Sequence, residues 1–421
     1  MDLARLTKLF ETNRETGTGG ITSVCSAHPL AIRAALELME ERKQPAVIEA
    51  TCNQVNQFGG YTGDKPADFA ARVRAAAAEV GLSEDNLLLG GDHLGPQPWR
   101  DEPASEAMAK AAEMVRQYAE SGFQKIHLDC SMPCADDPDV LSDELIAERA
   151  ASLASVAETT GSSLLYVIGT EVPAPGGMGT GHRITPTAPG SVEETVEAHR
   201  RAFETAGLAD AFKRVVAVVV QPGLDFGNEE VVHFDPARAT RLSGALETCP
   251  GLVFEAHSTD YQLPSAFAAL VKGHFAVLKV GPAATFALRE ALYALEGIEA
   301  ELVPSAERSR LRAMVEATML MRPAHWASHY KGSEQRQAYL RHFSYSDRIR
   351  YYWSAPEVEE ARQRLFDNLS KSGMPLPLVS QFLPQHIDAV SEGRLPAEPE
   401  ALVKANIRLA LTPYADALES R

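Results

Sequence analysis

Several short apolar runs of this chain end in polar residues whose types suit metal-assisted chemistry. LLLGGDH ends in Asp92 and His93, LVFEAHS carries His257 near its end, and LLYVIGTE ends in Glu171. Two imidazoles and a carboxylate form a mixed nitrogen and oxygen set that suits Zn²⁺ or Mn²⁺ and leaves positions open for substrate. We therefore predict a divalent metal held by His93, Glu171 and His257.

Each of these residues, taken alone, has a simpler explanation as a solvated or hydrogen-bonded polar group. His127 is a further metal candidate, although a shift of one residue along its strand would point it away from the others. The five cysteines are few and odd in number, and Cys130 and Cys134 form only a lone C-x3-C pair. We expect buried, reduced thiols rather than a disulfide framework or a zinc ribbon.

The polar residues belong to a repeated unit: a β-branched or apolar run, a polar tip and a stretch with helical periodicity. After Pro29, for example, Ile32, Leu36 and Met39 share one helical side. Continuous apolar runs suit parallel strands that are covered on both faces. Eight repeats favour closure into a TIM (β/α)8 barrel over an open doubly wound sheet. The runs cover residues 21–26, 46–53, 87–93, 125–131, 164–171, 215–221, 252–258 and 276–281.

In such a barrel the carboxyl ends of the strands form the mouth of the active site. Backbone N–H groups of HSTD (257–260) and VGPAAT (280–285) lie after the last two strands, where barrels commonly bind phosphate. Lys279 is expected to add a cation there, with pairing inside the barrel as its alternative. Arg350 is expected to reach over from the C-terminal part. The predicted substrate-binding residues are His28, Asn53, Gln54, Gln221, Ser258, Lys279 and Arg348.

The sequence predicts two parts. Residues 1–297 form the barrel, and residues 298–421 form a helical extension packed on it, because this stretch has helical windows and no clear strand. The windows cover residues 305–321 and 357–371. Between them lies FSYSDRIRYYW (343–353), which is too rich in aromatic residues and arginines for a plain linker. The simpler role for these rings is to attach the extension to the barrel.

Composition excludes several classes of function. The chain has 421 residues and a net charge of −17, from 40 Lys and Arg against 57 Asp and Glu. This balance argues against nucleic acid or an anionic membrane as a partner. No apolar run approaches the roughly 18–20 residues of a membrane span. The first residues lack a signal-peptide pattern, so we expect a cytoplasmic protein.

Nucleotide-binding motifs are also missing. GGMGTG (176–181) is superficially similar to a dinucleotide fingerprint, but it leads into HRITPTAPG instead of a helix. We predict a long loop that acts as a lid. No Walker A pattern or G-x-S-x-G elbow occurs, so kinase or hydrolase chemistry has no support.

Nine segments, in one order between about residues 15 and 370, closely resemble a known family. They are SVCSAHP, EATCNQVNQFGGYTG, GGDHLGPQPW, KIHLDCSM, YVIGTEVPAPGG, VVQPGLDFG, FEAHSTDYQ, LKVGPAATFALREAL and FSYSDRIRYYW. The family is the subunit of class II D-tagatose-1,6-bisphosphate aldolase that is usually called non-catalytic, often labelled tagatose 6-phosphate kinase. The resemblance implies a TIM barrel, sugar-phosphate metabolism such as galactitol breakdown, and support of a separate catalytic aldolase subunit.

The resemblance also bears on individual residues. Catalytic class II aldolases carry a related Asp-His pair, with Asp as proton-transfer group and His as zinc ligand, so Asp92 and His93 are similar to these positions. The chain lacks the H-G-x-S and G-G-S-G patterns of catalytic subunits. Two hypotheses follow: a partner of a catalytic aldolase subunit, or a metal-dependent 4-epimerase of ketoses or ketose phosphates. In the second, Asp92 and Glu171 are the predicted catalytic residues. Either role is compatible with a homo-oligomer.

Overall fold

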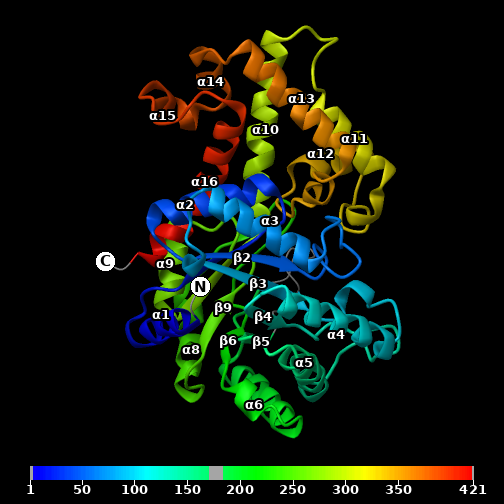
Figure 1. Cartoon of the computed structure of the whole chain (residues 1–421), viewed down its shortest axis with the longest axis vertical. Coiled ribbons are helices and arrows are strands. Elements are labelled where there is room, and N and C mark those ends of the chain that lie inside the picture. Colours follow the sequence, from blue (N-terminus) through cyan, green and yellow to red (C-terminus); the bar gives the residue numbers. More distant parts are fainter. Residues whose placement is uncertain (1–2, 170–183, 420–421) are drawn as a thin grey trace.

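The computed structural model, which describes residues 3–169 and 184–419, has the predicted TIM barrel (Figure 1). Eight parallel strands close in the order β1-β10-β9-β6-β5-β4-β3-β2. Each coincides with one of the predicted runs, to within one residue at its start or a few at its end. They are β1 (Ile21–Cys25), β2 (Ala46–Thr51), β3 (Leu87–Leu94), β4 (Lys125–Leu128), β5 (Leu165–Gly169), β6 (Val215–Val219), β9 (Val253–Ala256) and β10 (Phe275–Val280). An antiparallel ribbon of β7 (Asp225–Phe226) and β8 (Val231–Val232) follows β6.

Helices alternate with the strands and cover the outside of the barrel (Figure 1). Six of these helices have proline in the first turn, where its missing N–H costs no hydrogen bond: Pro29, Pro66, Pro189, Pro236, Pro264 and Pro282. The predicted side of Ile32, Leu36 and Met39 is buried in the helix that begins at Pro29. The helices are α1 (Leu3–Thr16), α2 (Pro29–Arg42), α3 (Pro66–Glu79), α4 (Ala104–Glu120), α5 (Asp143–Glu158), α6 (Pro189–Thr205), α7 (Ala209–Phe212), α8 (Pro236–Gly244), α9 (Pro264–Lys272) and α10 (Pro282–Leu302).

The amino end of the barrel is filled with apolar side chains. Leu6 and Phe10 of α1 are buried in one cluster with strand residues such as Ile21, Val47 and Val277. Branched and aromatic side chains of this kind fill small barrels completely. The interior is therefore a packed core at this end, and polar groups gather at the other.

The helical extension begins without a break. α10 continues through residue 297 to Leu302, so the predicted boundary lies inside a helix, and the division into two domains stays a prediction. As expected, the described residues after α10 contain helices and no strand. They are α11 (Leu311–Met321), α12 (Glu334–Phe343), α13 (Pro356–Ser372), α14 (Leu376–Phe382), α15 (Ile387–Ser391) and α16 (Pro399–Leu418).

The last helix returns from the extension to the barrel. In Figure 1, α16 runs beside α10 and ends near α2 and α9, and it contacts all three. The Tyr414 hydroxyl donates to the Thr259 carbonyl at 3.0 Å, and its ring centroid lies 4.1 Å from that of Phe267. The extension is thus tied to the barrel by buried contacts.

Two expectations about the chain can be compared with the structure. All five cysteines are free, and only Cys25 is half-buried while the others are buried, as expected for reduced thiols. Within residues 3–169 and 184–419, no helix combines the length and the hydropathy needed to cross a membrane.

Candidate active site

A cavity of about 1010 Å³ opens at the carboxyl end of the barrel strands. Every strand of the barrel contributes a lining residue at or near its carboxyl end. These residues are Cys25, Thr51, Asp92, Asp129, Gly169, Val219, His257 and Lys279. Because parallel strands in a closed barrel end on the same side, polar tips that are far apart in the sequence share one cavity.

Asp92 and His93 lie in an irregular part of β3. The pairing of β3 with β4 shifts register between Gly91 and Leu94, and His93 adopts a φ of 48°. In a regular strand, neighbouring side chains point to opposite faces. The irregularity lets both side chains join the same cluster. A left-handed conformation in a residue other than glycine costs free energy and is concentrated at functional sites.

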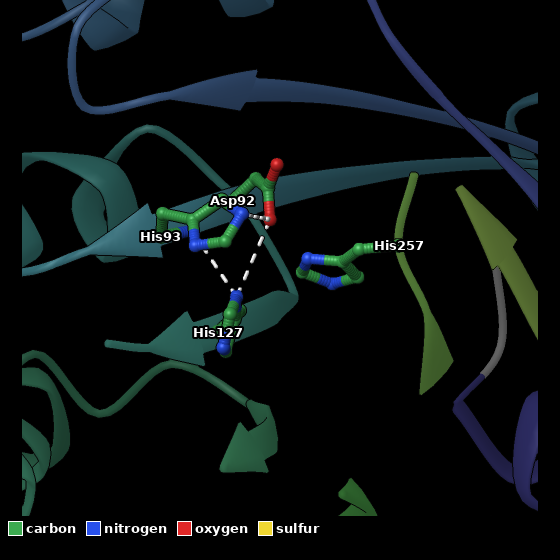
Figure 2. Close-up of side chains that lie close together, drawn as sticks. All are labelled: Asp92, His93, His127 and His257. Atoms are coloured by element: carbon green, nitrogen blue, oxygen red, sulfur yellow. Dashed lines mark hydrogen bonds and ion pairs between the residues drawn. The ribbon is translucent and has the colours of Figure 1, made fainter. Parts of the chain in front are cut away.

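Figure 2 shows Asp92, His93, His127 and His257 pointing toward one another. One potential ligand atom of each lies within 4.8 Å of the others. The ring centroid of His93 is 4.8 Å from those of both His127 and His257. Asp92 Oδ1 lies 3.3 Å from His127 Nδ1. The structure therefore brings together the predicted Asp92, His93 and His257, and with them His127, the further candidate.

Each of the three imidazoles is held from outside by an acceptor oxygen. His93 Nδ1 lies 2.8 Å from Asp129 Oδ2, and His257 Nε2 lies 2.9 Å from Glu255 Oε1. His127 Nε2 lies 2.9 Å from the last main-chain carbonyl of β5. These oxygens can only accept, so the nitrogen beside each carries a proton, and the opposite nitrogen can bind a metal when the ring is neutral. Imidazoles that bind metals are typically oriented in this way.

His127 differs from the other two rings. Its inner nitrogen, Nδ1, already accepts the backbone N–H of His93 at 3.2 Å. A metal at Nδ1 would have to share that lone pair. His93 and His257 are therefore better placed as ligands than His127.

Charges within the cluster set its protonation. Burial would raise the pKa of Asp92, but the charges of His93 and Lys279 outweigh it and hold this pKa well below its usual range. Burial would also lower the pKa of His93, but the carboxylates of Asp92 and Asp129 raise it to about 9. Burial lowers the pKa of His257 to about 3, so this ring is neutral at pH 7. Without a metal, the site thus presents the ionised carboxylate of Asp92, a protonated His93 and a neutral His257.

A network of buried ion pairs lies next to the cluster. Lys125 Nζ lies 2.8 Å from Glu49 Oε1 and 2.7 Å from Glu255 Oε2. Lys279 pairs with Glu49 and lies 2.6 Å from Asp92 Oδ1. Buried charges are tolerated only when they are paired in this way.

The donor set and the charge balance fit a divalent metal. Four carboxylates and two ammonium groups meet around the cluster. With His93 protonated they leave one negative charge, and they leave two once a metal displaces the His93 proton. The carboxylates are those of Asp92, Asp129, Glu49 and Glu255, and the ammonium groups are those of Lys125 and Lys279. Nitrogen and oxygen donors at this spacing suit Zn²⁺ or Mn²⁺. Glu171, the third predicted ligand, lies outside the described residues.

A carboxylate, that of Asp260, lies at part of the position where the sequence predicts phosphate binding. Asp260 Oδ1 accepts the backbone N–H groups of Gly281 and Ala283 at 3.0 and 2.8 Å. Lys279 points into the barrel and forms the interior ion pairs that were its alternative role. Carboxylates thus occupy two of the N–H groups, and the cation, that the sequence assigned to phosphate. A phosphate bound in this cavity would need other partners.

The remaining predicted residues fall into three groups. Five of them line the cavity: Asn53, Gln54, Gln221, Ser258 and Arg348. His28 is instead the N-cap of α2, where its Nδ1 accepts the backbone N–H of Leu30 at 3.2 Å. Glu171 and the predicted lid segment GGMGTG belong to residues 170–183, which the structure does not describe.

Sequence reasoning misses two residues around the site. Lys125 begins β4 and is buried, and a lysine at the head of the apolar run KIHL was the available signal. Tyr61 lies in the loop after β2 and lines the cavity, but nothing in that glycine-rich segment singles it out. The position of Cys25 is also informative, because its thiol donates to Asp92 Oδ2 at 3.2 Å.

Asp260 supports a prediction about pH. Burial raises its pKa to about 6, whereas an aspartate in the unfolded chain titrates near 4. The folded protein therefore binds this proton more tightly, and the ionised carboxylate lowers stability as pH rises through about 6. We expect Asp260→Asn, which keeps the acceptor oxygen, to raise the free energy of unfolding by about 1–3 kcal/mol more at pH 8 than at pH 5. Urea unfolding at both pH values measures the difference, and an equal effect at both would contradict it.

The chain was compared with protein families and with solved structures. The family model for "D-tagatose-1,6-bisphosphate aldolase subunit GatZ/KbaZ-like" matches residues 6–419. The crystal structure of "a probable tagatose 6 phosphate kinase" from Sinorhizobium meliloti 1021 is 50% identical, with a TM-score of 0.88, and covers 94% of this chain and 100% of that chain. A fructose-bisphosphate aldolase from Campylobacter jejuni covers 89% of this chain and 95% of that chain, at 14% identity and a TM-score of 0.46.

Proposed function

Since the chain belongs to the GatZ/KbaZ-like family of D-tagatose-1,6-bisphosphate aldolase subunits, a component of sugar-phosphate metabolism, we propose that it also has an active site of its own. The proposed reaction is metal-dependent inversion at C4 of a ketose or ketose phosphate. The observation that carries this proposal is the convergence of Asp92, His93, His127 and His257, all of which except His127 line the cavity. A subunit that only stabilised another protein would not need such a cluster.

The proposed chemistry breaks and re-forms one carbon–carbon bond. Asp92 accepts the proton of the C4 hydroxyl, the O–H electrons form the C4 carbonyl, and the C3–C4 electrons move toward the C2 carbonyl to give an enediolate. The released aldehyde turns its other face to C3, the bond re-forms, and Asp92 returns the proton to the C4 oxygen. A divalent metal held by His93 and His257 would polarise the C2 carbonyl. Tagatose and fructose are interconverted by this inversion.

Side chains of the cavity support sugar binding. Gln221 Oε1 accepts the backbone N–H groups of Gly223 and Leu224 at 2.7 and 3.0 Å, which fixes the amide. Its Nε2 is buried and has no acceptor among the described residues. A sugar hydroxyl would satisfy this donor. Asn53 and Gln54 add amide groups to the same cavity.

The second candidate role is support of a separate catalytic aldolase subunit. The family description favours it, as does the absence of the H-G-x-S and G-G-S-G patterns from the sequence. A kinase activity is not proposed, because the sequence has no Walker A pattern.

Metal analysis of the isolated chain, followed by assay, tests the proposal. We expect about one equivalent of Zn²⁺ or Mn²⁺, and interconversion of D-tagatose and D-fructose or of their 6-phosphates. His93→Ala and His257→Ala should each lose the metal and the turnover, since each removes a nitrogen donor. His233→Ala, which changes an exposed histidine, is the matched control.

The outcomes separate the two roles. A chain without metal and without turnover, which nevertheless raises the activity of a catalytic class II aldolase subunit, would leave only the supporting role. Release of a three-carbon aldehyde without the C4 epimer would indicate aldol cleavage in place of inversion.

A further inference from the structure

The segment 343–353 of the extension reaches the mouth of the barrel. The Tyr351 ring packs edge-on against Tyr61 in the loop after β2, with centroids 4.6 Å apart. The Tyr261 hydroxyl, from the loop after β9, donates to the Tyr345 carbonyl at 2.7 Å. These contacts attach the segment, as the simpler role of its aromatic rings requires. They do not explain why it carries two arginines.

Both arginines face the cavity that contains Asp92 and His93. Arg348 and Arg350 line it from the side of the extension. Each is half-buried, and within residues 3–169 and 184–419 no carboxylate lies within ion-pair distance of either guanidinium. Two guanidinium charges thus stand in a partly dehydrated cavity without a bound counter-charge.

Neutral acceptors hold these side chains in position. Arg348 Nη1 donates to the His325 carbonyl at 2.9 Å, while its Nε is buried without an acceptor among the described residues. Arg350 Nη1 donates to the Ser346 carbonyl at 2.5 Å, and its Nη2 donates to the Tyr351 hydroxyl at 3.0 Å. The guanidinium groups are therefore fixed in place, but their charge is not neutralised.

The nearest carboxylates are already engaged elsewhere. Asp260 accepts the two N–H groups at the start of α10. Asp347 Oδ2 accepts the Thr285 hydroxyl at 2.6 Å, and its Oδ1 lies 4.0 Å from Arg289 Nε. Lys279 is committed to Glu49 and Asp92. The extension, and not the loops after β9 and β10, thus supplies the positive charge on this side of the cavity that has no ion-pair partner among the described residues.

We propose that Arg348 and Arg350 form a subsite for the terminal phosphate of a ketose phosphate, which makes phosphorylated ketoses the preferred substrate class. This inference rests on the proposed function and specifies its substrate. Guanidinium groups bind phosphate oxygens through paired, charge-assisted hydrogen bonds. A phosphate here would receive the unused N–H donors of both side chains and would balance their charge.

Binding of two sugars that differ only in the phosphate tests the subsite. We expect calorimetry to show that the full-length protein binds D-tagatose 6-phosphate about tenfold or more tightly than D-tagatose. Arg348→Gln and Arg350→Gln should each remove most of that preference and leave the affinity for D-tagatose nearly unchanged. Arg348→Lys, which keeps a charge but loses the paired donors, should give an intermediate loss.

Arg100→Gln is the matched control, because Arg100 also lines the cavity but lies outside the extension. The subsite is overturned if the wild-type protein shows no preference for the phosphorylated sugar. It is also overturned if Arg100→Gln weakens phosphate binding as much as Arg348→Gln, or if Arg348→Gln weakens both sugars equally. Thermal unfolding of each variant shows whether it folds. If Arg350→Gln does not fold, Arg348→Gln and Arg348→Lys together decide whether the subsite exists.

Failure of the subsite and failure of the proposed function give different results. Arginine-dependent binding of the phosphorylated sugar without any turnover would retain the subsite and reject the epimerase. Turnover of both sugars that does not depend on Arg348 or Arg350 would retain the epimerase and reject the subsite.

Discussion

Replacement of Asp92 by asparagine is expected to lower kcat for C4 inversion by about 10²–10⁴-fold, with a much smaller change in KM. The amide is nearly the same size as the carboxylate, but it cannot take up the hydroxyl proton. Asp92 is the only carboxylate of the cluster in Figure 2, and its low pKa keeps it ionised at neutral pH. Steady-state kinetics with D-tagatose 6-phosphate and D-fructose 6-phosphate would measure the loss.

The metal content of the variant decides how Asp92 acts. If Asp92 moves the proton, Asp92→Asn keeps its metal and its fold while losing turnover. If metal and turnover disappear together, Asp92 is a ligand and another group is the base. Asp139→Asn is the matched control, since Asp139 also lines the cavity but is exposed at its rim. Unchanged turnover in Asp92→Asn would remove Asp92 from the mechanism.

The barrel could be predicted because its signal is repeated. Each strand is a short β-branched run that would be buried on both faces, and most of the helices that follow begin at proline, so eight weak local signals support one architecture. The two-stranded ribbon of β7 and β8 could not be predicted, because two-residue strands have no period. The start of α11 was predicted too early, since residues 305–307 form a turn and residues 308–310 have no regular structure before Leu311.

The candidate site was predictable in composition but not in geometry. Asp92, His93 and His257 could be identified because polar groups are unusual at the ends of apolar strands. The irregularity in β3 that lets Asp92 and His93 act together has no sequence pattern of its own. The double glycine before them is explained only by the structure, because a Cβ atom at Gly90 would lie 2.5 Å from Glu49 Oε1.

Long-range pairing accounts for the other differences. Asp260 and Gly281 are far enough apart in the sequence that one carboxylate filling the phosphate position could not be anticipated. The same holds for Lys279, whose two possible roles depended on whether Glu49 from β2 would reach it. Arg348 and Arg350 stood out by composition, but their position at the mouth follows from packing between Tyr351 and Tyr61.

The largest loss of stability is expected for Lys125→Met, about 3–5 kcal/mol in the free energy of unfolding. Lys125 is buried and lies within 2.8 Å of one oxygen each of Glu49 and Glu255. Methionine fills a similar volume but leaves both carboxylates with Lys279 as their remaining ammonium partner. Denaturant unfolding measures the effect, and Lys213→Met, which removes only an exposed ion pair with Asp210, should cause no measurable change.

A second variant separates lost charge balance from lost packing. Lys125→Met combined with Glu255→Gln removes one of the stranded charges, so it should recover part of the stability if electrostatics cause the loss. No recovery would mean that shape dominates, and no loss in the single variant would mean that the ion pairs do not stabilise the fold. The Glu255 carboxylate also orients the His257 ring through the hydrogen bond to its Nε2, and Lys279 forms an ion pair with Asp92. We therefore expect Lys125→Met to weaken metal binding as well as folding, because the same buried network supports both.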